Sequence, residues 1–418
     1  MNKKVLLNIF SLLSIQGVGY ILPLITLPYL VRILGPNNYG VYGYSLAIIQ
    51  YSILIIDFGF NLTVTKKISL NRDDKLIVSS VFWNVMACKL LLCIFTFLIT
   101  VAWSRIDNTF AGANLAVLMS SYTMVIGILI FPIWLFQGKE EITKIALINI
   151  SSKFLTVPLI FLLIDEPSDG WKVGLINGSG YIVAGIIGLH IVSRRNWIVW
   201  VKPTFSQMFR EYASAWHIFI SNASINIYTS SITVILGALT SPVTVGYFVA
   251  ADKIRLAFQG LINPVSQALY PRINALMKES PAAGFKTIRL LLRAQGVFFF
   301  ICSGFIFYLS PNIISFLYGE SYKESIPILK ILAWLPFIIA VSNVLGYQTL
   351  LVLNMERIFS RLVLVGGGIA LVIIFPLIIY FGGYGAALTI LIAEVSVNLL
   401  MLTTLIKKKF LYLKANND

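Results

Sequence analysis

Long apolar stretches separated by short polar gaps run along the whole chain. A run of about 20 apolar residues with few charges is long enough to cross the hydrocarbon core of a bilayer as one helix. The pattern therefore predicts an all-α, multi-pass membrane protein with twelve transmembrane helices. The predicted segments are 9–31, 41–60, 77–103, 114–136, 145–164, 173–192, 213–237, 243–266, 290–309, 326–353, 361–381 and 384–406.

Basic residues are concentrated in every second gap, and this predicts how the helices are oriented. Most of the 32 Lys and Arg residues lie at the two ends of the chain and in the gaps after segments 2, 4, 6, 8 and 10. Short loops rich in Lys and Arg stay in the cytoplasm, so both termini are predicted to be cytoplasmic. The first segment is interpreted as an uncleaved helix. The other gaps contain only Arg32, Arg105, Lys172 and Lys323.

A weak internal repeat divides the twelve segments into two groups of six. The motif at 31–35 recurs at 234–237, and the motif at 157–160 recurs at 375–378. An even number of helices gives both halves the same orientation, an arrangement found in some secondary transporters. We therefore predict two parallel six-helix lobes. They would comprise residues 1–200 and 201–418.

Composition agrees with a membrane protein and argues against other classes. Hydrophobic residues make up 58% of the chain and charged residues 12%, unlike the mix of a soluble domain. The net charge of +15 is spread over many short loops and forms no single basic face, so no nucleic-acid partner is expected. Cys88, Cys93 and Cys302 lie in apolar segments without metal-ligand spacing. We expect free, buried thiols and no metal site.

Sequence signatures of enzymes are missing. The kinase tripeptide Asp57-Phe58-Gly59 occurs without the Gly-rich and catalytic loops that kinases require. The chain has no Walker A sequence, and its two histidines form no H-E-x-x-H motif. We therefore predict that the protein is not an enzyme and uses no cofactor.

Several short motifs resemble one transporter family. They are Leu-Gly-Pro-x-x-Tyr-Gly-x-Tyr at 34–42, Asp-Phe-Gly-Phe at 57–60, Gly-Tyr-Phe-x-Ala-Ala-x-Lys-Ile at 246–254 and Tyr-Pro-Arg-Ile at 270–273. Together they resemble the polysaccharide-transporter branch of the multidrug/oligosaccharidyl-lipid/polysaccharide exporter (MOP) superfamily, most closely the bacterial O-antigen flippases of the Wzx type. The resemblance implies two six-helix lobes forming a V. It also implies alternating access that flips an undecaprenyl-pyrophosphate-linked repeat unit across the inner membrane, with a polysaccharide polymerase and a chain-length regulator as partners.

Charges inside predicted membrane segments are the main indication of a site. A charge near the centre of a membrane helix costs about 2.5–3.5 kcal/mol on insertion scales, so it usually faces a cavity or a partner. Segment 243–266 contains Asp252, Lys253 and Arg255. One face of this helix would carry a polar stripe, which favours a water-filled groove. Alternatively, Asp252 and Arg255 pair at i, i+3 and fix the helix to a neighbour. The stripe consists of Asp252, Arg255, Gln259, Asn263 and Gln267.

Four further charged residues are candidates. Lys89 and Glu394 lie near the middle of their segments without a charged partner within one turn, which favours a role in a cavity. For Glu394 the alternative is a protonated side chain bonded to a neighbouring helix. Arg32 lies at the outer end of its segment, where a snorkelling anchor is equally plausible. Asp57 lies near Lys66 and Lys67, and a structural ion pair with them is its alternative.

Segment 213–237 is unusually rich in hydroxyl and amide side chains, including Asn222 and Asn226. Such groups hold helices together in lipid, but this many on both faces also suit a helix that lines an aqueous cleft and binds sugar hydroxyls. Our prediction is that Lys89, Lys253, Arg255, Arg32, Asn222 and Asn226 bind the substrate, and that Asp252, Glu394 and Asp57 take part in ion coupling or gating.

These observations predict a flippase for a lipid-linked oligosaccharide, with membrane lipid as its second partner. The cations would offset the desolvation of the pyrophosphate, and rocking of one lobe against the other would move the head group outward. Coupling to H⁺ or Na⁺ would involve one of the acidic residues. Two alternatives stay open at this point. One is a cation-coupled multidrug exporter of the same superfamily, which would favour an acidic cavity, and the other is a membrane glycosyltransferase or polymerase.

Overall fold

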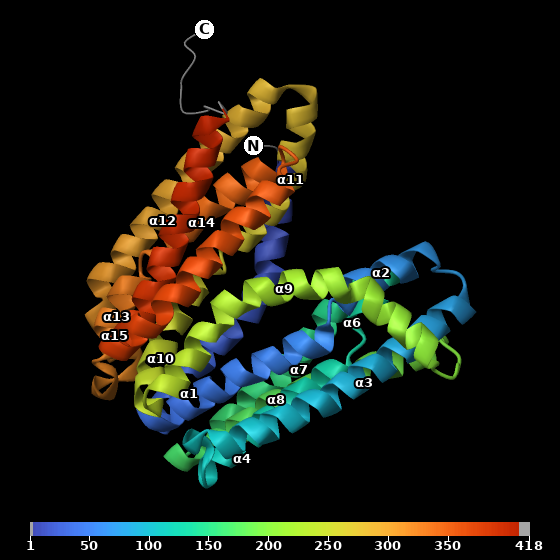
Figure 1. The fold of residues 1–418 in the computed structure, drawn as a ribbon, viewed down its shortest axis with the longest axis horizontal. Coiled ribbons are helices and arrows are strands. Elements are labelled where there is room, and N and C mark those ends of the chain that lie inside the picture. Colours follow the sequence, from blue (N-terminus) through green and yellow to red (C-terminus); the bar gives the residue numbers. More distant parts are fainter. Residues whose placement is uncertain (1–2, 409–418) are drawn as a thin grey trace. The chain divides into compact units, whose positions relative to one another are not determined.

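The computed structural model describes the backbone of residues 3–408, and the side chains of residues 24–408 except 142, 146, 221, 224–230 and 268. All regular elements of this part of the chain are helices (Figure 1). The elements are α1 (Lys3–Asp57), α2 (Phe60–Leu70), α3 (Lys75–Ile106), η1 (Asn108–Phe110), α4 (Ala113–Ser121), α5 (Thr123–Ile130), α6 (Ile133–Gly138), α7 (Ile142–Leu163), η2 (Pro167–Asp169), α8 (Gly170–Arg194), α9 (Phe205–Leu239), α10 (Pro242–Gln259), α11 (Ile262–Glu279), α12 (Pro281–Tyr318), η3 (Glu320–Tyr322), α13 (Ser325–Leu332), α14 (Leu335–Leu345), η4 (Gly346–Leu351) and α15 (Glu356–Lys407).

Eight helical stretches are long and apolar enough to cross a membrane, which confirms a multi-pass membrane protein. One of them, Glu356–Lys407, contains two predicted segments, and another, Leu24–Leu70, contains the segment 41–60 together with the end of the segment 9–31. Gly35 (φ 67°) and Gly382 (φ 53°) break these stretches, because glycine adopts positive φ at little cost. The remaining two predicted segments, 213–237 and 243–266, are helical but more polar, and neither is among the eight that the described residues contain. The number of twelve crossings and the cytoplasmic termini stay predictions.

Two predicted segments are interrupted within the membrane. Segment 114–136 is divided into α4, α5 and α6, with Phe131 in an extended conformation (φ −81°, ψ 106°) before Pro132. Proline disfavours the α conformation in the residue that precedes it. Segment 326–353 is divided into α13, α14 and the π-helical turn η4. Hydropathy alone predicts length and burial, and it does not register such local breaks.

The chain folds into two compact units, each described here by itself. One unit is Tyr29–Ala238, and the other combines residues 1–28 with 239–418. Helix α9 therefore belongs to the first unit although it follows the predicted lobe boundary at residue 200. The two units are defined by contacts within the fold, whereas the lobes 1–200 and 201–418 were predicted from a sequence repeat. The units therefore do not test the lobes, which stay a prediction.

The extended connection at 197–204, between α8 and α9, is attached to α3 along its length. The backbone N–H groups of Val199 and Thr204 donate to Ser79 Oγ (2.8 Å) and Asn84 Oδ1 (3.0 Å). In return, Trp83 Nε1 donates to the carbonyl of Val199 (3.0 Å). Side chains of α3 thus satisfy backbone groups that no helix or strand satisfies here. The connection is an integral part of the Tyr29–Ala238 unit.

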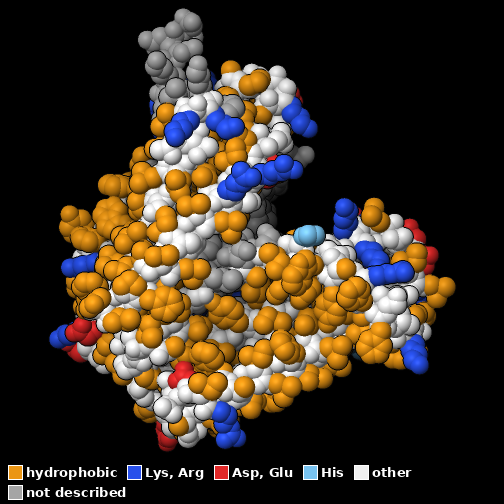
Figure 2. All heavy atoms as spheres, in the orientation of Figure 1, with side chains coloured by type: hydrophobic (Ala, Val, Ile, Leu, Met, Phe, Trp, Pro, Cys, Tyr) orange, Lys and Arg blue, Asp and Glu red, His pale blue; other side chains and the backbone are white. Residues whose placement is uncertain are grey.

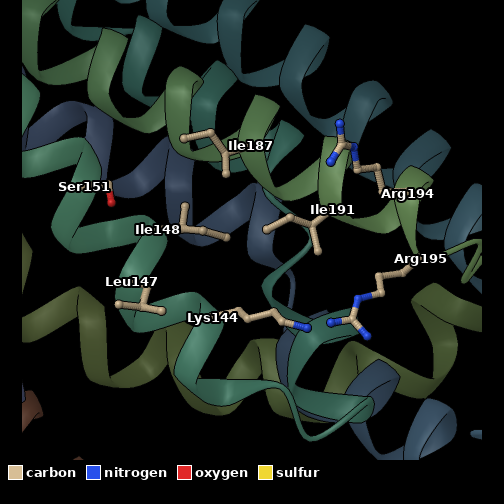
Figure 3. Close-up of a pocket in the computed structure, with 8 residues that line it drawn as sticks. All are labelled: Lys144, Leu147, Ile148, Ser151, Ile187, Ile191, Arg194 and Arg195. Atoms are coloured by element: carbon tan, nitrogen blue, oxygen red, sulfur yellow. The ribbon is translucent and has the colours of Figure 1, made fainter.

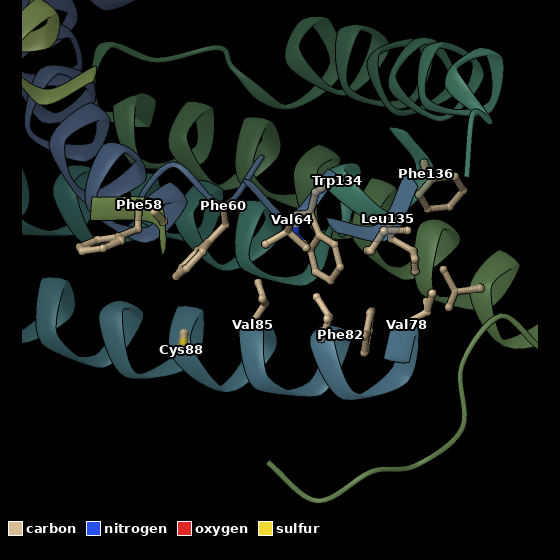
Figure 4. Packing of buried hydrophobic residues seen from close by; sticks show 14 of the residues in the cluster. Phe58, Phe60, Val64, Val78, Phe82, Val85, Cys88, Trp134, Leu135 and Phe136 are labelled. Carbon is tan, nitrogen blue, oxygen red and sulfur yellow. The ribbon is translucent and has the colours of Figure 1, made fainter. Parts of the chain in front are cut away.

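The core of this unit is a hydrophobic cluster built on α2, α3 and α6 (Figure 4). Phe60, Phe82 and Trp134 are almost completely buried in it. The opposite face of α3 exposes large apolar side chains such as Leu91 and Phe95, as expected of a helix whose outer surface meets lipid. Hydrophobic side chains spread over the visible surface of the molecule (Figure 2). The three cysteines are free thiols, as predicted, although Cys302 is only partly buried.

Candidate functional site

The first candidate site is built on a break between α1 and α2 inside the membrane segment. After Asp57, Phe58 and Gly59 have positive φ angles of 43° and 81°, and α2 starts at Phe60. The Phe58 ring stacks on Phe219 of α9, with centroids 4.4 Å apart and planes at 9°. This packing offsets the strain that positive φ imposes on a residue with a side chain. The break therefore depends on α9 as much as on the local sequence.

Gly59 allows α9 to approach the break closely. A Cβ atom at position 59 would lie 2.9 Å from Ile218 Cγ2 and 3.2 Å from the carbonyl oxygen of Ala215. Both distances are shorter than ordinary van der Waals contact, so only glycine fits without displacement of α9. The motif Asp57-Phe58-Gly59-Phe60 thus forms a break held between α1, α2 and α9.

A buried ion pair joins this break to α3. Lys89 Nζ lies 3.8 Å from Asp57 Oδ1, and the side chain of Lys89 is 1% exposed against 25% for Asp57. Asp57 therefore forms an ion pair, as its alternative predicted, but its partner is Lys89 and not Lys66 or Lys67. Lys67 pairs with Glu211 of α9. Lys89 has no local partner because its partner comes from another helix. In this conformation the charge of Lys89 is neutralised and inaccessible.

A cavity of about 180 Å³ lies between α1, α3 and α9 of the same unit. Ser52, Thr96 and Thr100 contribute hydroxyl groups to a lining that is otherwise mainly apolar. The residues 89, 96 and 100 differ by 7 and 11 positions, so they share one face of α3. One helix face therefore carries the buried cation and two hydroxyls. Sequence reasoning missed Ser52, Thr96 and Thr100, although the spacing from Lys89 would have indicated the two threonines.

The second cluster of charges lies in the other unit, on α10. Arg255 is buried, its Nε donates to Asp252 Oδ1 (2.6 Å), and it also bonds to Gln259. The i, i+3 pair that the sequence analysis gave as the alternative is present, and Lys253 beside it is half-buried. The predicted polar stripe is interrupted, because α10 ends at Gln259 and Asn263 and Gln267 belong to α11. The pair is compatible with the groove and with the structural alternative.

Glu394 is the acidic neighbour of this cluster. It lies half-buried on α15, which packs against α10. Asn398, one turn further along α15, donates to the carbonyl of Ile338 (3.0 Å). The pair of Asp252 and Arg255 and the acid Glu394 thus lie on two helices that pack together within one unit. Sequence spacing could not have paired residues that lie so far apart along the chain.

The remaining predicted residues are distributed over the chain. Arg32 is exposed and Asn222 is half-buried, and both make contacts within the protein. The side chain of Asn226 lies outside the described residues. Lys89 and Arg255 belong to different units, so their convergence on one cleft stays a prediction. Within the described part of the chain, no group of His, Cys, Asp or Glu residues could hold a metal ion.

Comparison with known proteins identifies the family. Residues 5–277 match the family described as "Polysaccharide biosynthesis protein". The chain belongs to this family. It is 36% identical, over 97% of both chains, to a protein of Escherichia coli (strain K12) named "Putative O-antigen transporter". The predicted resemblance to polysaccharide transporters is thereby confirmed. This member of the family is a multi-pass inner-membrane protein, and it is a transporter and not an enzyme.

Solved structures share its fold. One is described as "Lipid II flippase MurJ, inward closed conformation", with a TM-score of 0.72 and 14% identity over 96% of this chain and 89% of that chain. Another is an outward-facing multidrug resistance MATE family transporter of the MOP superfamily, with a TM-score of 0.58 and 14% identity over 99% and 97% of the two chains. At this identity the likeness concerns the fold alone, and it supports the predicted all-helical membrane fold.

Proposed function

We propose that this protein is a flippase that moves an undecaprenyl-pyrophosphate-linked oligosaccharide, such as an O-antigen repeat unit, across the inner membrane by alternating access. The observation that carries the proposal is the similarity along almost the whole chain to a protein named as an O-antigen transporter. The likeness in fold to a lipid II flippase supports a substrate with a lipid-linked sugar. A polymerase and a chain-length regulator that receive the translocated unit are part of the same proposal.

The geometry around Lys89 supports a role in handling the pyrophosphate. A membrane protein retains a buried ammonium at a cost, and such charges commonly mark a substrate or ion pathway. With the side chain only 1% exposed, Asp57 must release Lys89 before an anion can reach it. We propose that the pyrophosphate replaces the carboxylate as the partner of Lys89 when the break between α1 and α2 opens. The hydroxyl groups of the neighbouring cavity would then contact the sugar.

Ion coupling is the second part of the mechanism. A carboxylate that is neutralised by a proton or by Na⁺ no longer holds the cation beside it. Protonation of Asp57 would free Lys89, and a cation at Asp252 or Glu394 would weaken their hold on Arg255. In both units an acid would thereby control whether a base is available to the substrate. Lys253 and Arg32 would add to the attraction of the anionic head group, and Asn222 and Asn226 to contacts with the sugar.

The test of the function uses the full-length protein in its own host. Deletion of the gene should abolish surface polysaccharide while the lipid-linked repeat unit accumulates, and expression of the intact chain should restore it. Surface glycan is measured by immunoblot and the intermediate by mass spectrometry of extracted lipids. An intact glycan in the deletion strain, together with increased sensitivity to cationic drugs, would instead support the multidrug exporter.

The pair on α10 gives a prediction that separates structure from transport. Exchange of Asp252 and Arg255 (Asp252→Arg with Arg255→Asp) should restore the protein abundance that either single change lowers, because the i, i+3 contact is re-formed. Surface glycan should stay low, since the exchange moves the positive charge by about 4.5 Å along the helix. Both quantities are measured on the same cells by immunoblot. Full recovery of the glycan would mean that the pair is only structural.

A further inference from the structure

A groove runs between α7 and α8 on the Tyr29–Ala238 unit, away from the ion pair described above (Figure 3). Its volume is about 360 Å³. Leu147, Ile148, Ile187 and Ile191 form apolar walls. Ile148 belongs to the hydrophobic core, whereas Leu147 is 60% exposed. The base of the groove is therefore part of the packed core, and its rim is exposed at the surface of the unit.

Three basic residues surround one end of this groove. Lys144 lies in the first turn of α7, and Arg194 and Arg195 lie at the end of α8. These positions fall in or beside two of the basic gaps that are predicted to be cytoplasmic. Both α7 and α8 are long and apolar enough to cross a membrane. The basic end thus lies where a membrane helix leaves the hydrocarbon, at the depth of lipid head groups.

The positive charge at this end is only partly neutralised. Lys144 pairs with Glu141 (2.8 Å) and lies 5.7 Å from the centre of the Trp197 ring. Among the side chains that the structure describes, Arg194 and Arg195 form no ion pair. Figure 3 shows the Lys144 ammonium and the Arg195 guanidinium turned toward one another. Two like charges that converge in this way repel each other unless an anion lies between them.

We infer that this groove binds an anionic glycerophospholipid of the adjacent leaflet. The lipid phosphate contacts Arg195 and Lys144, Arg194 adds positive charge at the same end of the groove, and one acyl chain follows the apolar walls. Basic pockets between transmembrane helices on the cytoplasmic side bind anionic head groups in this way. Arginine suits the phosphate because its guanidinium donates two parallel hydrogen bonds. Basic residues that only orient a helix in the membrane need no apolar groove beside them. The apolar walls therefore favour a binding site for a lipid.

The groove fits a membrane phospholipid better than the translocated substrate. Apart from the three basic side chains, Ser151 is the only polar side chain in the lining, so the groove offers little to a sugar. Lys89 is also not among the residues that line it. The inference therefore does not depend on the proposed transport function, and its failure would leave that function untouched.

The experiment measures lipid retention by the purified full-length protein. Native mass spectrometry after delipidation and addition of phosphatidylglycerol or phosphatidylcholine should show preferential retention of phosphatidylglycerol. The double variant Arg194→Gln/Arg195→Gln should lose this preference by about tenfold or more, because each basic residue near a membrane surface contributes substantially to anionic lipid binding. The control Lys278→Gln/Lys286→Gln removes two exposed charges elsewhere and should retain it. Equal retention of both lipids by the unmodified protein would overturn the inference.

Two further measurements test the acyl chain and the identity of the lipid. Ile191→Asn should weaken phosphatidylglycerol retention while the basic residues stay in place, and Arg195→Lys, which keeps the charge, should preserve most of it. Glycerol phosphate, which lacks acyl chains, should not compete. Competition by glycerol phosphate at equal concentration would reduce the groove to a simple anion site. Displacement by undecaprenyl pyrophosphate at lower concentration than phosphatidylglycerol would make it a carrier-lipid site. Either outcome would contradict the inference. If the double glutamine variant fails to fold, these competitions on the unmodified protein decide the question.

Discussion

Replacement of Asp57 by asparagine is expected to lower the abundance of the protein sharply and to abolish surface polysaccharide. The change leaves the ammonium of Lys89 without a counterion at 1% exposure. Removing one partner of a buried ion pair costs about 3–5 kcal/mol, because the remaining charge stays buried and uncompensated. The free energy of unfolding or the thermal midpoint of the purified protein gives the stability, and an immunoblot of surface glycan gives the transport.

The double variant Asp57→Asn/Lys89→Met separates the two effects. With both charges removed, most of the lost stability should return, because no uncompensated charge is left. Export should stay low if Lys89 binds the pyrophosphate. The matched control is the exposed pair of Arg72 and Glu140 (2.5 Å), in which Arg72 lowers the pKa of the Glu140 carboxyl. Disruption of that pair by Glu140→Gln should leave the thermal midpoint almost unchanged, because water screens an exposed ion pair. Normal glycan in the stable double variant would exclude Lys89 from transport.

Substitution of Gly59 by alanine is the second change with a large expected effect. The added Cβ atom would lie 2.9 Å from Ile218 Cγ2, and the backbone would have to hold φ at 81° with a side chain present. Strain at such a position costs about 1–3 kcal/mol, and the break would shift relative to α9. We expect a lower thermal midpoint together with reduced export, since the break positions Asp57.

A second substitution tests whether the contact with α9 is the cause. The double variant Gly59→Ala/Ile218→Ala should lose less free energy of unfolding than the two single variants lose together. The difference, which is the coupling energy, should be about 0.5–3 kcal/mol. Gly296→Ala in α12 is the control, because nothing lies within 4 Å of a Cβ atom at that position. It should be neutral or slightly stabilising. If the losses in free energy of unfolding at positions 59 and 218 simply add, the close approach of α9 does not determine the conformation of the break.

Hydropathy predicted the helical class and the membrane location because a bilayer imposes one length and one polarity on every crossing. It also placed Asp57-Phe58-Gly59-Phe60 at the end of a segment, where the structure has the break. It could not predict that Phe58 adopts positive φ, since this depends on a ring from α9. The hydrophobic pattern of a segment predicts that segment's helix, whereas a contact between two helices depends on which helices become neighbours in the fold.

The same limit applies to the charged residues. Lys89 and Asp57 were both recognised as unusual, because an isolated charge in an apolar segment stands out in the sequence. Their partnership was missed, because they belong to different helices, and Lys66 and Lys67 were nearer in sequence. The pair of Asp252 and Arg255 was recognised as an alternative, because one turn of one helix determines it. Pairing within a helix can be read from spacing, and pairing between helices requires the fold.

The attachment of residues 197–204 to α3 has a consequence for experiments in which the protein is expressed as two separate fragments. A cut after residue 200 would interrupt the connection 197–204, which is hydrogen-bonded to Ser79, Trp83 and Asn84. It would also place α9 in a different fragment from the core against which it packs. A cut between Ala238 and Pro242 would leave Tyr29–Ala238 uninterrupted and lie in the short gap before α10. Reassembly of a working transporter from co-expressed halves should therefore succeed at the second position and fail at the first.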